Sequence, residues 1–408
     1  MDKLTDVLIV GGGLNGPALA LALAQAGLTT RILDAAPATQ FEDAAFDGRA
    51  YALALASRRM LSALDLWDGL AGHAQEILDI KVADGIEGTG STGAPLHFDH
   101  RDIAETEMGH LLEDRFLRKG LLDACAASDA ITTENDATVV AQTSGPDSAT
   151  VTLADGRRHS ARLLVAADGR SSPTATRAGI TRIGWDYAQT SLVAAVDIEK
   201  PHLGVAHQMF FAQGPLAILP LPGNRVSIVW TESNARAAAI SALTDTAYLD
   251  VLRPRFGSFL GEIALAGQRY SYPLGLTLAN RLIAPRLALV GDAAHGIHPL
   301  AGQGLNLGLR DVAALAQVLV DATRRGEDIG ATDVLERYRR WRQFDIAAVA
   351  AATDGINRVF SNNHPLLRAG RAFALGAANA LPGLRRAMIR QAAGITGDLP
   401  HLMQGRTL

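Results

Sequence analysis

A glycine-rich turn near the start of the chain constrains its fold more than any other feature. Val7–Val10 is a short, continuous apolar run, typical of a strand buried on both faces of a sheet. The segment Gly11–Gly16 follows in the pattern G-x-G-x-x-G, and Ala18–Ala26 is rich in alanine and leucine, which favours a helix. Thr30–Leu33 predicts a second buried strand. This order of strand, turn, helix and strand predicts a parallel α/β sheet that binds a dinucleotide.

The residues of this turn have separate tasks in dinucleotide binding. Gly11 permits the tight turn, Gly13 lets the backbone approach a pyrophosphate, and Gly16 lets the helix pack on the strand. The N-terminus of the helix offers free N–H groups and a positive dipole to the phosphates. Asp34, 21 residues beyond Gly13, can accept hydrogen bonds from an adenosine ribose. The segment Gly88–Gly93 matches the same glycine pattern but no helical stretch follows it, so we expect a loop there.

Two further apolar runs lead into acids. Leu163–Ala167 is followed by Asp168, and Leu287–Val290 is followed by a glycine and Asp292. Acids at the carboxyl ends of parallel strands lie where ligands bind, although a single Asp-Gly pair such as that at Asp168 is also typical of a surface turn. A glycine-rich segment, GQGLNLG, then opens a predicted helix over Leu305–Ala322 and creates a second anion-binding helix terminus. One dinucleotide spanning both termini would explain both segments, and the glycine turn alone does not distinguish FAD from NAD.

Together the three segments resemble the fingerprints of single-component FAD-dependent aromatic hydroxylases, the p-hydroxybenzoate hydroxylase superfamily. The long segment Gly291–Asp311 is the most specific and is similar to that of the UbiH/UbiF-type 2-polyprenylphenol hydroxylases of ubiquinone biosynthesis. Shorter blocks that also resemble the family are Asp47–Leu53 with Ser57, Leu112–Arg115, Gly214–Pro220 and Phe360–Asn362. The resemblance covers nearly the whole chain. It implies FAD as cofactor, NADH or NADPH as co-substrate, and O2.

The resemblance also implies which residues bind FAD. Glycines of the first turn and Asp34 would hold the pyrophosphate and the adenosine ribose, two arginines would reach the phosphates or the ribityl chain, and Asp292 would hold a ribityl hydroxyl. Pro299 and the loop Gly302–Asn306 would line the isoalloxazine ring with backbone N–H groups, where a helix N-terminus stabilises the anionic reduced flavin by about 0.3–1 kcal/mol. The implied residues are Gly11, Gly13, Leu14, Asn15, Gly16, Asp34, Arg49, Arg115, Asp168, Asp292, Pro299, Gly302, Gly304, Leu305 and Asn306. The sequence identifies no catalytic acid or base.

One position departs from the family pattern. After the Asp-Gly of the middle fingerprint, Ala175 stands where the family carries an arginine, and Arg177 lies two places later. In the family this region also shapes the approach of NAD(P)H. The departure weakens the implied role of the segment in handling NAD(P)H and leaves its role in FAD binding unaffected.

We expect an α/β fold in which a Rossmann-like FAD-binding domain of the GR2 type carries an inserted, mostly antiparallel β-sheet domain for substrate, with helices at the C-terminus. Short apolar runs separated by Gly, Pro and Asn turns predict the inserted sheet. They are Ser191–Ile198, Gln208–Phe211, Leu216–Leu221 and Val226–Trp230. The expected division is 1–75, 101–179 and 274–345 for FAD, 76–100 and 180–273 for substrate, and 346–408 for the C-terminal helices. Four aromatics of the inserted region could line a substrate face, although sheet core is the commoner role of each: Trp185, Phe210, Phe211 and Trp230.

Composition excludes several other classes. The 38 Lys and Arg nearly balance the 42 Asp and Glu, so nothing predicts a nucleic-acid partner. The single cysteine, Cys125, excludes a disulfide framework or a cysteine-rich metal site, and we expect it buried in a helix over Leu117–Ala127. Asp292, His295 and His298 could in principle hold a metal, but the glycine-rich loop around them favours a flavin, and we predict no metal. The apolar N-terminal stretch lacks a positive leader and is interrupted by glycines and Pro17, which predicts a cytoplasmic protein.

The C-terminal region carries six arginines and no acid between residues 355 and 397. Leu384 and Met388 recur at helical spacing beside Arg386 and Arg390. This pattern fits either a basic amphipathic helix on the inner face of the cytoplasmic membrane, or a helical layer packed on the FAD domain with its arginines in water.

The resemblance implies ring hydroxylation of a hydrophobic, phenolic polyprenyl intermediate of ubiquinone biosynthesis through a flavin hydroperoxide. We expect the membrane surface and other quinone-biosynthesis proteins as partners. Two alternative functions would use the same FAD-binding residues. One is a FAD-dependent prenyl reductase, and the other is a FAD-holding assembly subunit of a quinone-synthesis complex.

Overall fold

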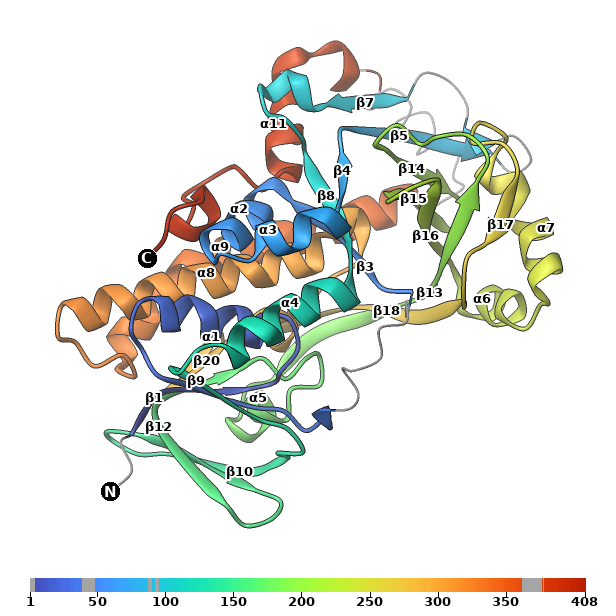
Figure 1. Ribbon diagram of the computed structural model, residues 1–408. Coiled ribbons are helices and arrows are strands. Elements are labelled where there is room, and N and C mark those ends of the chain that lie inside the picture. The colour runs from blue at the N-terminus through green and yellow to red at the C-terminus, as the bar shows by residue number, and fades with distance from the viewer. Residues whose placement is uncertain (1–3, 39–47, 87–89, 92–94, 362–375, 377) are drawn as a thin grey trace.

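The first sheet of the molecule is built around the N-terminal strand. In the computed structural model, which describes residues 4–38, 48–86, 90–91, 95–361, 376 and 378–408, β1 (Thr5–Val10) pairs in parallel with β2 (Thr30–Leu33) and with β12 (Arg158–Ala166) (Figure 1). Strand β20 (Leu287–Leu289) joins β12 in parallel, and β9 (Ile131–Glu134) joins β2. The apolar runs of all three fingerprints therefore lie in one sheet. Its remaining strands are β10 (Val139–Ser144), β11 (Ala149–Leu153) and β19 (Ile283–Ala284).

Helices α1, α4 and α8 cover one face of these parallel strands (Figure 1). Helix α1 spans Asn15–Gln25 and so begins three residues earlier than expected. The earlier start is possible because Pro17 lies in the first turn, where its missing N–H group has no helical partner to lose. Similarly, α8 spans Gln303–Arg324, so the residues expected in a loop after Gly302 form the first turn of the helix. Helix α4 (Asp114–Ala126) buries Cys125, whose thiol lies 3.7 Å from the carbonyl oxygen of Pro17.

The second sheet is mostly antiparallel, as expected, and lies at the other end of the molecule (Figure 1). Strands β13 (Arg182–Ile198) and β18 (Tyr270–Ala279) extend from the first sheet toward it. The other strands are β5 (Asp79–Ile86), β6 (Gly90–Ser91), β7 (Leu96–Asp99), β14 (Val205–Phe211), β15 (Gly214–Leu221), β16 (Arg225–Ser233), β17 (Ile263–Leu265) and β21 (His295–Gly296). Strand β6 contains two residues of the second glycine cluster, for which we expected a loop, and the other residues of 87–94 lie outside the described part.

The aromatics of the inserted region have different environments. Trp230 and Phe211 are buried in the core beneath this sheet, which confirms the core interpretation for both. Phe210 is also buried, and its ring lies 4.2 Å from that of Phe360. Trp185 is 42% exposed and belongs to no core cluster of the described residues.

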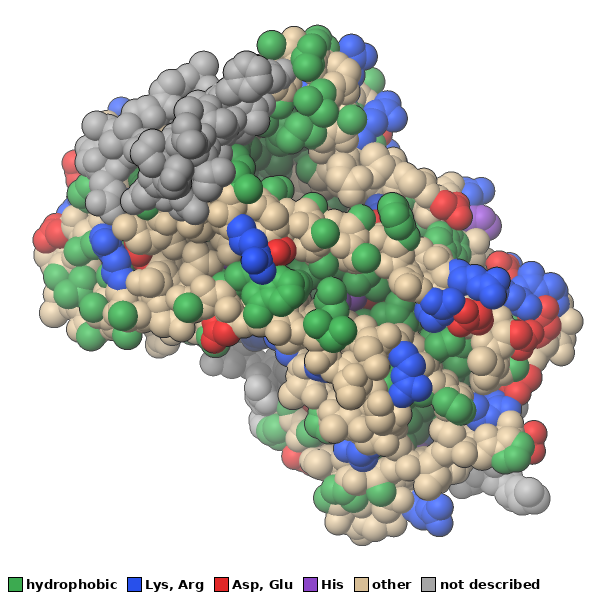
Figure 2. Space-filling model, turned by 180° about the vertical axis from the view of Figure 1, so that it is seen from behind, with side chains coloured by type: hydrophobic (Ala, Val, Ile, Leu, Met, Phe, Trp, Pro, Cys, Tyr) green, Lys and Arg blue, Asp and Glu red, His purple; other side chains and the backbone are tan. Residues whose placement is uncertain are grey.

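A small third sheet and several helices complete the described chain. The sheet holds β3 (Ala50–Ala54), β8 (Gly109–Glu113) and β4 (Gln75–Ile77). The other helices are α2 (Leu55–Ala63), α3 (Trp67–Leu70), α5 (Pro173–Arg177), α6 (Asn234–Ser241), α7 (Asp245–Phe256), α9 (Thr332–Phe360) and α11 (Pro382–Ala392). None of the helices in the described ranges is long and apolar enough to cross a bilayer. On the face opposite to that of Figure 1, hydrophobic side chains gather near the middle, with charged side chains around them (Figure 2).

The C-terminal helix α11 packs one side on the body of the protein. Its Ile389 is fully buried in a cluster with Phe98 of β7 and Leu55 of α2, and Arg385 pairs with Asp102 at 3.0 Å. The helix therefore covers β7 and α2 rather than the parallel sheet that carries the fingerprints. The reason is that the side chains of α11 which face inward meet the small apolar cluster around β7. Its opposite side, including Leu384, remains exposed.

Candidate functional site

The first glycine turn is shaped by close backbone approaches. Gly11 has a φ of +115°, and a side chain there would collide with the carbonyl oxygen of Ala167 at the end of β12. A side chain at Gly16 would collide with the carbonyl oxygen of Gly11. A side chain at Gly13, in contrast, would meet nothing within 4 Å. The turn is thus tightly packed at Gly11 and Gly16 and open at Gly13, the position expected to face a pyrophosphate.

The N-terminus of α1 is free to bind an anion. Its N-cap residue, Leu14, makes no side-chain hydrogen bond to the first turn, so the leading N–H groups have no internal cap. Asp34 accepts a hydrogen bond from Gly12 N at 2.6 Å and another from Ala36 N at 2.8 Å. These bonds fix the carboxylate of Asp34 at the end of β2, beside the turn.

Asn15 joins the first fingerprint to the third. Added side-chain atoms at Gly308 of α8 would lie 2.7 Å from Nδ2 and 2.8 Å from Oδ1 of Asn15, and a side chain at Gly291 would collide with the same amide. A side chain on either side of Asn15 would therefore force its amide to move. The buried Oδ1 of Asn15 has no hydrogen-bond partner among the described residues. The turn before α1 and the segment after β20 are consequently in direct contact.

The middle fingerprint reaches both of the others. The backbone N of Asp168 lies 2.9 Å from where a Cβ of Gly11 would be, and Arg170 Nε pairs with Asp292 Oδ2 at 3.4 Å. Asp168 itself accepts hydrogen bonds from the Ser172 hydroxyl and, at 3.0 Å, from Thr174 N. Its carboxylate therefore holds the start of α5. Segments that are more than a hundred residues apart in the chain thus surround one edge of the sheet.

The family carries an arginine where this chain has Ala175, and neither Ala175 nor the later Arg177 supplies an arginine at this edge of the sheet. Ala175 is fully buried. Arg177 donates to Gln142 Oε1 and to Thr174 Oγ1, each at 3.1 Å, and so its guanidinium is committed to the side of α5 that faces β10. The position of Arg177 does not restore the missing group.

The segment after β20 forms a second helix terminus. Gly302 has a φ of +62° and precedes α8, whose first turn contains Gly304, Leu305 and Asn306. The side chain of Asn306 is fully used within the protein: its Oδ1 accepts from Ala54 N and from the Ser57 hydroxyl, and its Nδ2 donates to Ala52 O and Gly302 O, all within 2.9 Å. Contact with a cofactor is therefore left to the backbone of this turn, whose leading N–H groups lack a side-chain cap.

The remaining predicted residues are Asp292, Arg49, Arg115 and Pro299. The Asp292 side chain is 44% exposed beside Arg170. Arg49 pairs with Asp114 at 3.4 Å, and Arg115 pairs with Glu113 at 2.6 Å while its guanidinium lies over the ring of Phe116. Pro299 directly precedes η5 (Leu300–Gly302). The geometry is compatible with FAD, and binding by these residues stays a prediction.

A buried ionic cluster supports the third fingerprint, and the sequence analysis assigned it no role. Asp311 is fully buried and accepts hydrogen bonds from Gly291 N at 3.1 Å, His295 Nε2 at 2.6 Å and Arg342 Nε at 2.8 Å. Burial alone would raise the pKa of Asp311, but His295 and Arg342 outweigh it and hold the pKa below its ordinary value. Asp311 thus fixes the turn at Gly291 from behind. The only sequence signal was its place within the long family segment.

Among the described residues, Asp292, His295 and His298 do not bring their ligand atoms close enough together to share an ion. His295 is committed to Asp311, and in the described part of the chain the group of acids and histidines close enough to share an ion is Asp79, His97 and Asp99. The two oxygens of Asp99 are bonded to Arg101, which lowers the pKa of that carboxyl to about 2.

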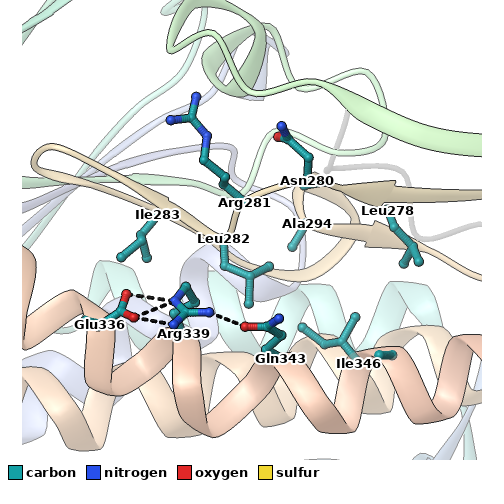
Figure 3. A pocket seen from close by; sticks show the side chains of 12 residues that line it. Leu278, Asn280, Arg281, Leu282, Ile283, Ala294, Glu336, Arg339, Gln343 and Ile346 are labelled. Atoms are coloured by element: carbon teal, nitrogen blue, oxygen red, sulfur yellow. Dashed lines mark hydrogen bonds and ion pairs between the residues drawn. The ribbon is translucent and has the colours of Figure 1, made fainter.

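A cavity of about 460 Å³ lies between β18 and α9 (Figure 3). Leu278, Leu282 and Ile346 supply apolar walls, and Arg339 is bonded to Glu336 and Gln343 on its floor (Figure 3). None of the predicted FAD residues lines this cavity. It is therefore separate from the residues predicted to bind FAD.

Comparison with known proteins agrees with this geometry. Residues 4–353 match the family described as FAD binding domain. The chain is 43% identical to ubiquinone hydroxylase UbiL of Rhodospirillum rubrum over 99% of this chain and 94% of that protein. It is 35% identical to 3-demethoxyubiquinol 3-hydroxylase of Escherichia coli over 97% of this chain and all of that protein. The fold is also that of p-nitrophenol 4-monooxygenase PnpA from Pseudomonas putida, with a TM-score of 0.79 at 19% identity over 97% and 99% of the two chains.

Proposed function

This chain belongs to the FAD-binding-domain family and, within it, to the ubiquinone hydroxylases, and we propose that it hydroxylates the aromatic ring of a polyprenylphenol intermediate in ubiquinone biosynthesis. The observation that carries the proposal is the identity of 43% over nearly the full length of both chains. The contact of Asn15 with Gly291 and Gly308 supports it, because it brings the predicted pyrophosphate and ring-binding segments together.

The residues of the three fingerprints at this edge of the first sheet fit FAD. The open backbone at Gly13 leaves room for a pyrophosphate, and the uncapped N-termini of α1 and α8 offer N–H donors to the cofactor. The orphaned Oδ1 of Asn15 could accept a hydrogen bond from a hydroxyl of the cofactor. When bound and reduced by NADH or NADPH, FAD would supply the chemistry that reacts with O2. The protein would hold the cofactor, orient the phenol and exclude water, so that reducing equivalents are not lost as H2O2.

We further propose that α11 rests on an anionic membrane surface, where a polyprenyl substrate would reside. Leu384 and Met388 are exposed on one side of the helix, Leu381 is exposed at its N-cap, and Arg386 and Arg390 are exposed on the side away from Leu384 and Met388. A helix with one exposed apolar side and arginines on another fits the interface of an acidic bilayer. The L384D/M388D double variant should lose binding to anionic vesicles while keeping its FAD. Equal binding of this variant and the wild type would contradict the placement on membranes.

The enzymatic proposal is tested with purified protein, FAD, NADH or NADPH, and a short-chain prenylphenol. We expect bound flavin to be bleached by the nicotinamide cofactor, oxygen to be consumed, and the phenol to gain one oxygen atom. Saturation of the prenyl chain without oxygen consumption would indicate a reductase instead. Flavin that NAD(P)H does not bleach would indicate an assembly subunit. The D292A variant should retain less FAD, and full flavin absorbance in that variant would contradict the role of Asp292.

A further inference from the structure

His298 is buried at the junction between the third fingerprint and the antiparallel sheet. It lies between β21 and η5, directly before Pro299, and only 1% of its surface is exposed. Its ring meets the ring of Tyr187 of β13 edge-on, with 5.2 Å between the centroids. His298 therefore stands where the loop expected beside the flavin ring faces a strand of the expected substrate sheet.

Both ring nitrogens of His298 lack a hydrogen-bond partner in the part of the chain that the structure describes. His295, three residues earlier, differs because its Nε2 is bonded to Asp311. A buried donor or acceptor left without a partner costs about 1–3 kcal/mol. Two such atoms on one ring are unexpected in a residue whose only task is packing. They indicate that a group from outside the chain completes the site.

The neighbouring polar groups are already committed to one another. The Tyr187 hydroxyl and Trp185 Nε1 both donate to Asp354 Oδ1, at 3.0 and 3.1 Å, and Arg358 pairs with the other oxygen at 2.8 Å. Burial, together with Asp354, raises the pKa of the Tyr187 hydroxyl, so that this group stays a donor to Asp354. The side wall of the site is thus fixed, and its groups leave the His298 nitrogens free to bind a ligand.

The ring of His298 is neutral at physiological pH. Burial lowers the pKa of His298 to about 4, although the charge of Asp354 opposes this shift. A neutral imidazole presents one N–H donor and one acceptor nitrogen, which matches the two capacities of a phenolic hydroxyl. With so low a pKa it is a poor acceptor of a full proton from a phenol. The neutral imidazole is therefore suited to orienting the phenol ring and not to acting as a general base.

We propose that His298 hydrogen-bonds the ring hydroxyl of the phenolic substrate and so orients the ring for hydroxylation. The inference rests on the proposed function and adds to it the residue that recognises the phenol. No electrons or protons are transferred through His298 in this role. The residue differs from the predicted FAD ligands because it faces β13, a strand of the sheet expected to receive the substrate.

The H298L and H298Q variants test this role with the full-length, FAD-loaded protein. H298L should keep its FAD and its reduction by NAD(P)H without substrate, raise the KM for a short-chain prenylphenol about tenfold to a hundredfold, and release more H2O2 per product. H298Q, which retains a donor and an acceptor, should recover part of the loss and covers the case in which the leucine variant does not fold. H401L, a change at a partly exposed histidine in η6 (His401–Gln404), should match the wild type.

The outcomes separate the two levels of the proposal. If the wild type forms no hydroxylated phenol, the proposed function fails. If the wild type does so and H298L shows the same KM and the same H2O2 yield, only the role of His298 is refuted. Loss of FAD from both His298 variants, or an altered flavin spectrum with unchanged substrate affinity, would also refute it, since His298 would then serve the cofactor.

Discussion

Replacing Gly308 with alanine tests the junction between the first and third fingerprints. Gly308 lies within α8, so the change by itself favours the helix by about 1 kcal/mol. A Cβ at this position would nevertheless lie 2.7 Å from Nδ2 and 2.8 Å from Oδ1 of Asn15. The amide cannot move away easily because Gly291 lies against its other side. The clash must therefore move the Asn15 amide or, where Gly291 blocks that movement, the N-terminus of α1 or the segment after β20.

A matched control isolates this effect. Gly355 lies in α9, and a Cβ there would meet nothing within 4 Å, so G355A should gain the helical stabilisation without a clash. Overpacking of a close-packed interior costs about 1–3 kcal/mol, and we expect G308A to be less stable than G355A by this amount. Urea unfolding measures the difference, and flavin absorbance of the purified proteins should show lower FAD content in G308A alone.

A third variant makes the reasoning refutable. Removing the amide in N15A/G308A should restore part of the stability lost in G308A, with a coupling of about 0.5 kcal/mol or more between the two sites. Equal stability and equal FAD content of G308A and G355A would show that Asn15 does not join the two segments.

Three other predictions concern buried groups. D311N should lower the free energy of unfolding by about 1.5–3 kcal/mol, because Arg342 loses one of its two carboxylate partners and keeps Asp345. D250N at an exposed ion pair should change it little, and equal urea curves for the two variants would contradict this account. The thiol of Cys125 should react with a thiol reagent only after denaturation, since it is 2% exposed and burial raises its pKa to about 12, and rapid labelling of the native protein would oppose this. Burial lowers the pKa of His207 to about 4, so between about pH 6.5 and pH 4 the unfolded chain binds a proton at this residue and the folded chain does not. The free energy of unfolding should therefore fall as the pH is lowered from about 6.5 to about 4, and it should fall less steeply in H207Q. Unfolding measured at several pH values tests this.

The local parts of the fold could be predicted because they depend on short stretches of sequence. The apolar run Val7–Val10, the glycine turn and the strand Thr30–Leu33 all lie in the structure where the pattern placed them. Helix boundaries were less accurate. The first turns of α1 and α8 were predicted as loop because glycine, proline and asparagine are poor helix formers, yet a first turn tolerates them.

The supporting contacts of the site could not be predicted in this way. Arg342 stands in an arginine-rich stretch, and only the tertiary fold shows that it is buried on Asp311. Likewise, Asn306 was expected to line the flavin ring as part of a loop with backbone N–H groups, but three of the four hydrogen bonds of its side chain depend on β3 and α2, about 250 residues away. The family itself was predicted correctly because the segment Gly291–Asp311 is long and specific.

The central claim is that three separated segments of one chain bind a single FAD. Titration of FAD into flavin-free protein, followed by quenching of flavin fluorescence, tests it most directly. We predict saturation at one FAD per chain for the wild type, with weaker binding in G308A and in D292A. A chain that quenches no fluorescence at any FAD concentration, or variants that bind as tightly as the wild type, would contradict the claim.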